Sequence, residues 1–335
     1  IQLDGVSGGG QMLRTALSLA MITGQPFRIT NIRGKRSRAG LMRQHLSCVK
    51  AAWEISDGIA DGAEIGSTEL VFRAGKVRGG SYQFAIGSAG SAMLLFQTLL
   101  PALWSADEPT ELRLEGGTHN PMAPPFEFIE RIFLPALARI GPEVSVRLGC
   151  TGFAPAGGGV VEATIQPCKA LSFFDLVERP EEGTPRIRVL YRYLEMAIAG
   201  RMLDAALELL PTKDAVVENR EPGPGPGICC LVESEHGRAR EMASVFGEKG
   251  VTAETLGRNV AKMMQNNLGS GVPVGGHLAD QLLLPMALAG GGRFVTMKPD
   301  NHVPTNIWVI GKFLPVRFSI EETERKQRMI SVERV

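Results

Sequence analysis

Long hydrophobic runs and paired cysteines are both missing from this chain. Its most apolar stretches, such as residues 282–289, are far shorter than the roughly 20 residues that a helix needs to span a bilayer. The five cysteines include no C-x-x-C pair, and their odd number and loose spacing indicate reduced thiols in a cytosol-like compartment. Residues 1–10 are rich in glycine and lack the basic and apolar regions of a secretory leader. We therefore expect a cytoplasmic protein that makes no contact with membranes.

Aromatic residues and excess charge are also scarce. Only 6% of the residues are aromatic, whereas 40 are glycine, so the fold must rely on aliphatic packing and tight turns. The 36 Lys and Arg residues are balanced by 35 Asp and Glu, and any contact with nucleic acid must therefore come from a local patch. No zinc-type cluster, Walker A loop or Ser-His-Asp signature occurs. The 335 residues suffice for one large domain or two ordinary ones.

What the chain does contain is an internal repeat. Residues 7–30, 87–114 and 275–297 each read as a glycine-rich turn, a largely apolar helix, a short break and a strand. A second helix follows each of them, at residues 41–53, 126–138 and 305–314. The strand pairs expected next are 69–72 with 82–86, 143–148 with 160–165, and 316–320 with 329–333. With its leading strand, each unit is a βαβαββ module, and such modules stack because one alone cannot bury its apolar helices.

These patterns predict an α/β (α+β) protein in two parts. Repeated βαβαββ modules form a large catalytic domain, expected at residues 1–177 and 269–335, with its apolar helices packed between sheets. A smaller α/β domain, expected at residues 178–268, interrupts the array before the third module and has borders of linker composition. Its expected elements are strands 186–191 and 228–233, helices 203–210, 238–246 and 253–268, and a Gly-Pro spacer at 222–227.

The first glycine-rich loop, at residues 4–10, runs directly into a helix. Its backbone N–H groups could cradle phosphates, although the same glycines would equally serve helix–sheet packing. Arg14 lies one turn inside this helix, on a mostly apolar face. A charged side chain in that position needs a partner, which an anionic ligand would supply.

A dense basic cluster occupies residues 33–45 of this nearly neutral chain. It is either a solvated loop or a site for the phosphate-bearing end of a polymer. The second interpretation is supported by three hydrogen-bond donors at the start of the helix that follows. Few aromatic residues lie nearby, so recognition would depend on the phosphate more than on the base. With the arginine of the preceding helix, the candidate RNA- and phosphate-binding residues are Arg14, Arg36, Arg38, Arg43, Gln44 and His45.

Two polar side chains interrupt apolar helices. Asp280 lies in the apolar segment 278–289, where an unpaired carboxylate would be costly. It either holds a metal or a basic partner beside His302, or forms a simple buried ion pair. Gln97 occupies a similar position in the second repeat. Pro124, with the proline after it, either walls a flat heterocycle or marks the entry to a helix.

His302 lies in a polar turn between two prolines, Pro299 and Pro304. A histidine held in this way has little packing to do, so the turn indicates chemistry: imidazole can act as a nucleophile, a proton carrier or a metal ligand near neutral pH. The alternative is an ordinary surface histidine. His236 and His277 have no acidic companions at ligand spacing and are interpreted as structural or surface residues.

Taken together, these motifs resemble the RNA 3′-terminal phosphate cyclase family. The matching segments occur in the family's order and cover essentially the whole chain, including the inserted domain. They are GGGQMLR at 8–14, RQH at 43–45, GSAGS at 87–91, GGTHNP at 116–121, APP at 123–125, PAGGG at 155–159, LADQ at 278–281 and HVPTN at 302–306.

The resemblance implies an ATP-dependent ligase that forms a cyclic phosphodiester. In this family ATP and a divalent metal (Mg or Mn) convert an RNA 3′-phosphate into a 2′,3′-cyclic phosphate. The nucleophilic histidine falls on His302, which would take AMP from ATP with release of diphosphate and pass it to the RNA 3′-phosphate; the neighbouring 2′-OH then displaces AMP. Gln97, Pro124 and Asp280 would join His302 on the nucleotide side, with Asp280 as a metal ligand. An oligomer is compatible with this assignment.

The chemistry implied by the resemblance is physically coherent. A 3′-phosphomonoester has no good leaving group, and an anhydride to AMP supplies one. Ring closure is then intramolecular, where effective molarities reach about 10⁵–10⁸ M.

Two positions depart from the family pattern. The family's first loop usually carries a glutamate before its glycine run, where this chain has Ser7, and an Asp or Asn is more usual at His119. Two alternatives stay open: a non-catalytic cyclase-like protein of ribosome assembly that binds RNA, and an enolpyruvyl transferase, which shares the repeated architecture but has no nucleotide-accepting histidine.

Overall fold

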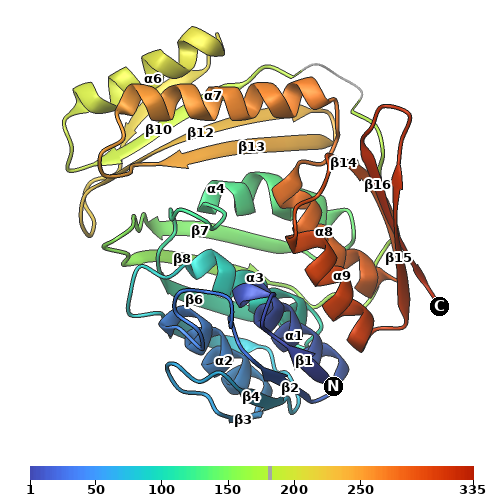
Figure 1. Cartoon of the computed structure of the whole chain (residues 1–335). Coiled ribbons are helices and arrows are strands. Elements are labelled where there is room, and N and C mark those ends of the chain that lie inside the picture. The colour runs from blue at the N-terminus through green and yellow to red at the C-terminus, as the bar shows by residue number, and fades with distance from the viewer. Residues whose placement is uncertain (180–182) are drawn as a thin grey trace.

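The computed structural model describes residues 1–179 and 183–335. Over these ranges, helices and strands alternate and build four separate four-stranded sheets (Figure 1). The predicted α/β class is confirmed. No helix in the described ranges combines the length and the apolar character needed to cross a bilayer.

The first module has the predicted order of elements. It consists of β1 (Gln2–Asp4), α1 (Gly9–Thr23), β2 (Phe27–Thr30), α2 (Arg43–Ser56), β3 (Ile59–Asp61) and β4 (Leu70–Arg73). The prediction that residues 82–86 pair with 69–72 is wrong, because β4 pairs with β3. The short β3 escaped notice because Ile59–Asp61 has only three residues and no alternating pattern.

The second module begins with β5, the strand that the sequence pattern pairs with the first module. Its elements are β5 (Gly80–Ala85), α3 (Ala92–Trp104), β6 (Thr110–Gly116), α4 (Phe126–Phe128), the π-helical turn η1 (Ile129–Phe133), α5 (Leu134–Ala138), β7 (Val144–Cys150) and β8 (Gly159–Ile165). The segment α4–η1–α5 coincides with the predicted helix 126–138. Helix α3 is buried on nearly all sides, as its apolar composition predicts.

The third module is split by the inserted segment. Its elements are β9 (Phe174–Leu176), α8 (Gly276–Ala289), β14 (Gly291–Thr296), α9 (His302–Phe313), β15 (Val316–Glu322) and β16 (Arg328–Arg334). Strand β9 pairs in parallel with β14 although more than a hundred residues separate them along the chain. All three modular sheets have the same order, in which the second strand lies between the first and the fourth. This shared topology shows that the modules are structural repeats.

The helices of the modules meet one another in the interior. Helix α1 packs against α2, α3 and α9, and α8 packs against α9. Alternating burial along β2 and β4 shows that one face of the first sheet covers these helices, while the other faces solvent. Segments from the first and third modules are thereby brought side by side, as Figure 1 shows for α1 and α9.

The inserted segment forms its own layer, at the top of Figure 1. Its elements are β10 (Arg186–Arg192), α6 (Met196–Leu209), β11 (Ala215–Asn219), β12 (Gly227–His236), β13 (Ala239–Phe246) and α7 (Ala253–Ser270). Strand β11 was not anticipated, and α7 runs two residues past the predicted border. The segment also has a separate buried core, in which Val189, Met202 and Val260 take part.

The prediction of a helix at residues 238–246 is wrong. This segment is β13, which pairs antiparallel with β12 along its whole length. Its Ala, Glu and Met residues favour a helix locally, but the unpaired edge of β12 offers a full ladder of hydrogen bonds, and tertiary context overrides local propensity. The outcome matters for the site, because a strand directs alternate side chains to one face.

Candidate functional site

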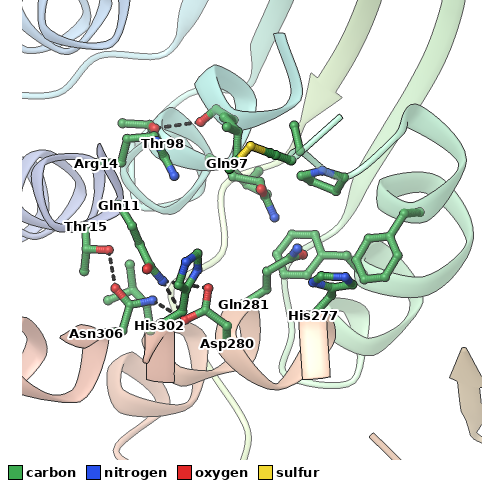
Figure 2. A pocket seen from close by; sticks show the side chains of 18 of the residues that line it. Gln11, Arg14, Thr15, Gln97, Thr98, His277, Asp280, Gln281, His302 and Asn306 are labelled. Carbon is green, nitrogen blue, oxygen red and sulfur yellow. Dashed lines mark hydrogen bonds between the residues drawn. The ribbon is translucent and has the colours of Figure 1, made fainter. Parts of the chain in front are cut away.

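Two cavities adjoin one another where the modules meet, and the inserted segment adds part of the wall. The larger has a volume of about 520 Å³ and the smaller about 240 Å³. Seven residues line both of them: Gln11, Arg14, Leu94, Pro121, Met122, Ala123 and His302. His302 therefore lies at the junction of the two cavities, and Figure 2 shows its imidazole beside Gln11 and Asp280 in one of them.

The smaller cavity is surrounded by helix N-termini. Residues at the start of α1, α2, α3 and α9 line it, among them Gly9, His45, Ser91 and His302. The N-cap residues of α1 and α9 make no side-chain cap, and neither helix has an acidic residue in its first turn; at the start of α9, Asp300 accepts the N–H of His302. Free N–H groups and the positive ends of helix dipoles together favour an anion. The repeated topology explains the arrangement, because it places corresponding helix starts around one centre.

Gly10 and His45 are in close contact in the wall of this cavity. A Cβ atom on Gly10 would lie 2.2 Å from Nε2 of His45, so this position requires glycine. The backbone N–H of Met42 donates to Nδ1 of His45, which leaves the proton of the neutral ring on Nε2. Burial, with help from the cations of Arg14 and Arg33, lowers the pKa of His45 to about 4. His45 is thus a neutral N–H donor near pH 7, not a cation.

Arg14 lines both cavities and is the main cation of the site. Burial lowers the pKa of its guanidinium, while Cys48 and Asp280 act in the opposite direction. Within the described residues, no hydrogen bond or ion pair is made by its guanidinium nitrogens. A half-buried, partly desolvated cation without a partner is costly, and an anionic ligand would supply the missing contacts.

The structure separates the other predicted phosphate-binding residues. Arg36 and Gln44 line the smaller cavity with His45. Arg38 lies outside both cavities, on an exposed loop. Arg43 also lies outside them and donates from Nη1 to the carbonyl oxygen of Gly87 at 3.1 Å. The basic cluster is therefore divided into an inner part that reaches the cavity and an outer part.

The larger cavity contains the residues predicted for the nucleotide side. Gln97, Pro124 and Asp280 all line it. Two side chains that the sequence analysis did not select, His277 and Gln281, join them from α8 (Figure 2). His277 was interpreted from the sequence as a structural or surface residue, but its exposed ring lines the cavity. Gln281 could have been found from the sequence, because it is a second polar residue beside Asp280 on an apolar helix.

Flat surfaces and an unused acceptor characterise this cavity. The rings of Phe128 and His277 meet edge to face, with centroids 6.4 Å apart, and Pro124 also lines the space. Oε1 of Gln281 is buried and has no hydrogen-bond partner in the described part of the chain. Alternate residues of β13 complete the wall: Met242, Ser244 and Phe246. Apolar walls with a few polar groups are typical of sites for a heterocycle.

His302 is the first residue of α9, so the predicted loop position needs correction. The helix begins three residues earlier than expected, because Oδ1 of Asp300 accepts the backbone N–H of His302 at 2.8 Å and supports the first turn. Proline at position 304 is tolerated in a first turn, where its missing N–H would be unpaired in any case.

Beside His302, Asp280 accepts hydrogen bonds from two amides. Nε2 of Gln11 lies 2.6 and 2.7 Å from its two oxygens, and Nδ2 of Asn306 lies 2.7 Å from Oδ1. Asn306 in turn accepts from the hydroxyl of Thr15 at 2.7 Å, as the dashed lines in Figure 2 show. Burial raises the pKa of Asp280 to about 6, and the nearby His302 opposes this shift. The network joins α1, α8 and α9.

The donor set at Asp280 does not fit a protein-held metal. Its oxygens already face N–H donors, and a cation would need the same lone pairs. Among the described residues, no group of three or more His, Cys, Asp or Glu side chains could hold a metal ion. The expectation that Asp280 ligates a metal therefore disagrees with the geometry.

A buried pair anchors the loop between the two cavities. Nε2 of His119 lies 2.7 Å from Oε2 of Glu127, and both side chains are almost fully buried. Arg220, from the inserted segment, lies 3.8 Å from the same carboxylate. Met122, three residues after His119, has a left-handed backbone conformation and is 92% exposed at the rim. The histidine that departs from the family pattern thus has a structural partner.

Fold and site together define a protein built from βαβαββ modules, with two adjoining cavities where the modules meet and a lining of Arg14 and helix N-termini that suits an anion. The chain belongs to the RNA 3′-terminal phosphate cyclase family: the model of that family matches residues 6–320.

Two solved structures share a weaker likeness. One is the enolpyruvyl transferase NikO from Streptomyces tendae, 12% identical with a TM-score of 0.40; the match covers 98% of this chain and 48% of that one. The other is EPSP synthase from Acinetobacter baumannii, 13% identical with a TM-score of 0.34, covering 98% of this chain and 64% of that one. This chain thus spans about half to two thirds of their lengths, and the likeness carries no functional argument.

Proposed function

We propose that this protein converts the 3′-phosphate end of RNA into a 2′,3′-cyclic phosphate at the expense of ATP, with His302 as the nucleophile. One observation carries the proposal. His302 lies between a cavity with flat walls and a smaller one surrounded by helix N-termini. A residue that accepts a group from one substrate and passes it to another must be accessible to both.

The larger cavity suits the nucleoside of ATP. Pro124, Phe128 and His277 offer surfaces for a flat base. The unpartnered Oε1 of Gln281 is an acceptor and favours a base with an exocyclic amino group, as adenine has. A site with a buried, unpaired acceptor discriminates against a base that cannot donate to it. The α-phosphate would then lie toward His302 and Arg14.

The smaller cavity suits the terminal phosphate of RNA. Arg14, Arg36 and the neutral N–H of His45 converge there with backbone N–H groups. The described residues that line it include no Phe, Tyr or Trp, and base stacking is the usual route to sequence preference in single strands. We therefore expect recognition of the phosphate end with little dependence on sequence.

The proposed reaction consists of three successive displacements at phosphorus. A ring nitrogen of His302 attacks the α-phosphorus of ATP, a P–N bond forms, and diphosphate leaves. An oxygen of the RNA 3′-phosphate then attacks the same phosphorus, and imidazole leaves. Finally the 2′-OH attacks the 3′-phosphorus, its proton is lost, and AMP leaves. Arg14 lines both cavities and is positioned to neutralise phosphate charge in each displacement.

Incubation with ATP labelled at the α-phosphate tests the proposal. We expect an acid-labile covalent adenylate, seen as labelled protein and as an intact-mass increase of one AMP. His302→Ala should abolish the label, whereas His236→Ala, which alters a buried histidine outside both cavities, should keep it if the variant folds. Labelling of His302→Ala would refute the assigned nucleophile. A folded wild-type protein that binds RNA but never labels would support the non-catalytic alternative.

The divided basic cluster gives a matched pair of variants for the RNA side. Arg36→Gln should weaken binding of a 3′-phosphorylated RNA and reduce the slope of log K against log salt by about 1. Arg38→Gln removes the same charge outside the cavity and should have a smaller effect. Both variants should still form the adenylate. Loss of labelling in Arg36→Gln would connect this residue to ATP instead.

A further inference from the structure

We propose that the transfer centre holds no divalent metal of its own, and that any cation used there arrives already bound to the phosphates of the nucleotide. In this arrangement Asp280, Gln11 and Asn306 position the helices around His302 and do not act as metal ligands. The inference rests on the proposed function, since it concerns the phosphate chemistry of that same site.

The first support is that both carboxylate oxygens of Asp280 already accept hydrogen bonds. Three N–H···O contacts of 2.6–2.7 Å occupy its two oxygens. The amide of Asn306 cannot simply turn its oxygen toward the carboxylate, because that oxygen accepts from Thr15. In the turned state, two oxygens would lie 2.7 Å apart. A metal that took these lone pairs of Asp280 would therefore have to displace the amides of Gln11 and Asn306.

The second support is the lack of other acidic ligands. Among the described residues that line the two cavities, the acidic ones are Asp280 and Asp300. Asp300 already accepts the backbone N–H of His302. Before the glycines of the first loop the chain has Ser7, a neutral residue. Mg²⁺ sites in proteins normally use one or two carboxylates together with substrate phosphates and water. Here the carboxylates are missing or engaged.

The third support is that positive charge is supplied in another way. Arg14 has no hydrogen bond or ion pair from its guanidinium within the described residues, and the starts of α1, α2, α3 and α9 surround the smaller cavity. Guanidinium and helix N-termini stabilise phosphate charge without a metal. A nucleotide that carries its own cation would need no further metal ligand from the protein.

The direct test is to titrate the full chain with Mn²⁺ in the absence of nucleotide and to measure binding by electron paramagnetic resonance. We expect either no stoichiometric site or a site unaffected by Asp280→Asn and by Asp300→Asn. One stoichiometric site that is lost in either variant would overturn the proposal. A loss counts only in a variant whose melting curve shows that it is folded, and since the two variants remove different carboxylates, one folded variant suffices. This measurement needs no activity and stays interpretable even if no adenylate forms.

A second measurement uses the nucleotide. With an ATP analogue that carries a methylene bridge between its α- and β-phosphates, the affinity of Mn²⁺ for the protein-bound nucleotide should be within about tenfold of its affinity for the free nucleotide. A larger gain, above about 1.4 kcal/mol, would show that protein ligands contribute and would overturn the proposal. Ser7→Glu is the matched positive variant. It adds a carboxylate just before Gly8 in the cavity wall, and we expect it to raise the Mn²⁺ affinity of the complex.

Discussion

Substitution of Arg14 tests whether this site lowers the free energy of unfolding of the protein. In Arg14→Met the aliphatic part of the side chain is kept. The half-buried cation, which makes no hydrogen bond or ion pair among the described residues, is removed. Replacing buried charge by apolar groups of similar volume stabilises proteins by about 1–4 kcal/mol. Because Arg14 lines two cavities that water can enter, we expect the lower half, about 1–2 kcal/mol. At about 2 °C per kcal/mol for a large chain, the melting temperature should rise by about 2–4 °C.

The same variant should lose its response to phosphates. A hydrogen bond to a charged group contributes about 1.5–3 kcal/mol, so loss of Arg14 should weaken binding of ATP and diphosphate by roughly 10- to 100-fold. Thermal melting with and without each ligand measures both effects. Wild type should gain about 2.7 kcal/mol at a hundred times its dissociation constant, and Arg14→Met should gain only about 0.4–1.4 kcal/mol at that same concentration. Arg14→Lys keeps the charge without the planar fork and should lie between them. A ligand-free Arg14→Met that melts below wild type would refute this reasoning.

Three further predictions concern packing and pH. Gly10→Ala places a methyl group 2.2 Å from Nε2 of His45 and should cost about 1–3 kcal/mol of unfolding free energy in urea titrations, whereas Gly276→Ala, where nothing lies within 4 Å of the new Cβ, should not; equal effects would contradict the close contact. Burial raises the pKa of Glu241 from 4.5 to about 7, so folding stability should fall by up to about 3 kcal/mol as the pH rises through this interval. Glu241→Gln should flatten this dependence of stability on pH, and an unchanged dependence would contradict the assignment to Glu241. His119→Ala leaves Glu127 buried without its near partner and should cost about 3–5 kcal/mol; near-neutral stability in the same titration would show that the pair has no anchoring role.

Local patterns predicted the elements that carry long periodic signals. The apolar helices α1, α3 and α8 and the hairpins β7–β8 and β15–β16 follow directly from hydrophobic spacing, since helical and strand periods are properties of neighbouring residues. Errors arose where the pattern was short or where a partner distant in sequence decided. The three-residue β3 was missed, and β13 was assigned to a helix because nothing local reveals the free edge of β12.

The candidate site shows the same division. Polar residues on apolar helices led from the sequence to Arg14, Gln97 and Asp280, because burying such groups is costly unless they have a purpose. The contribution of Met242, Ser244 and Phe246 to the larger cavity could not be predicted, since it depends on how the inserted segment packs against the large domain. Nor could the sequence predict that Arg36 lines the smaller cavity and that Arg38 does not, because this depends on the conformation of the loop that carries both residues.

By itself, the amino-acid sequence determined the modular repeat, the presence of an insertion and a histidine beside an aspartate in chemically suggestive surroundings. These are encoded by spacing, composition and turn residues over short distances. Only the tertiary structure decided that His302 stands between two cavities, that helix starts from all three modules surround this point, and that Asp280 is already engaged by Gln11 and Asn306. Each of these depends on groups far apart in the chain, and their distances are set by the packing of one module against another.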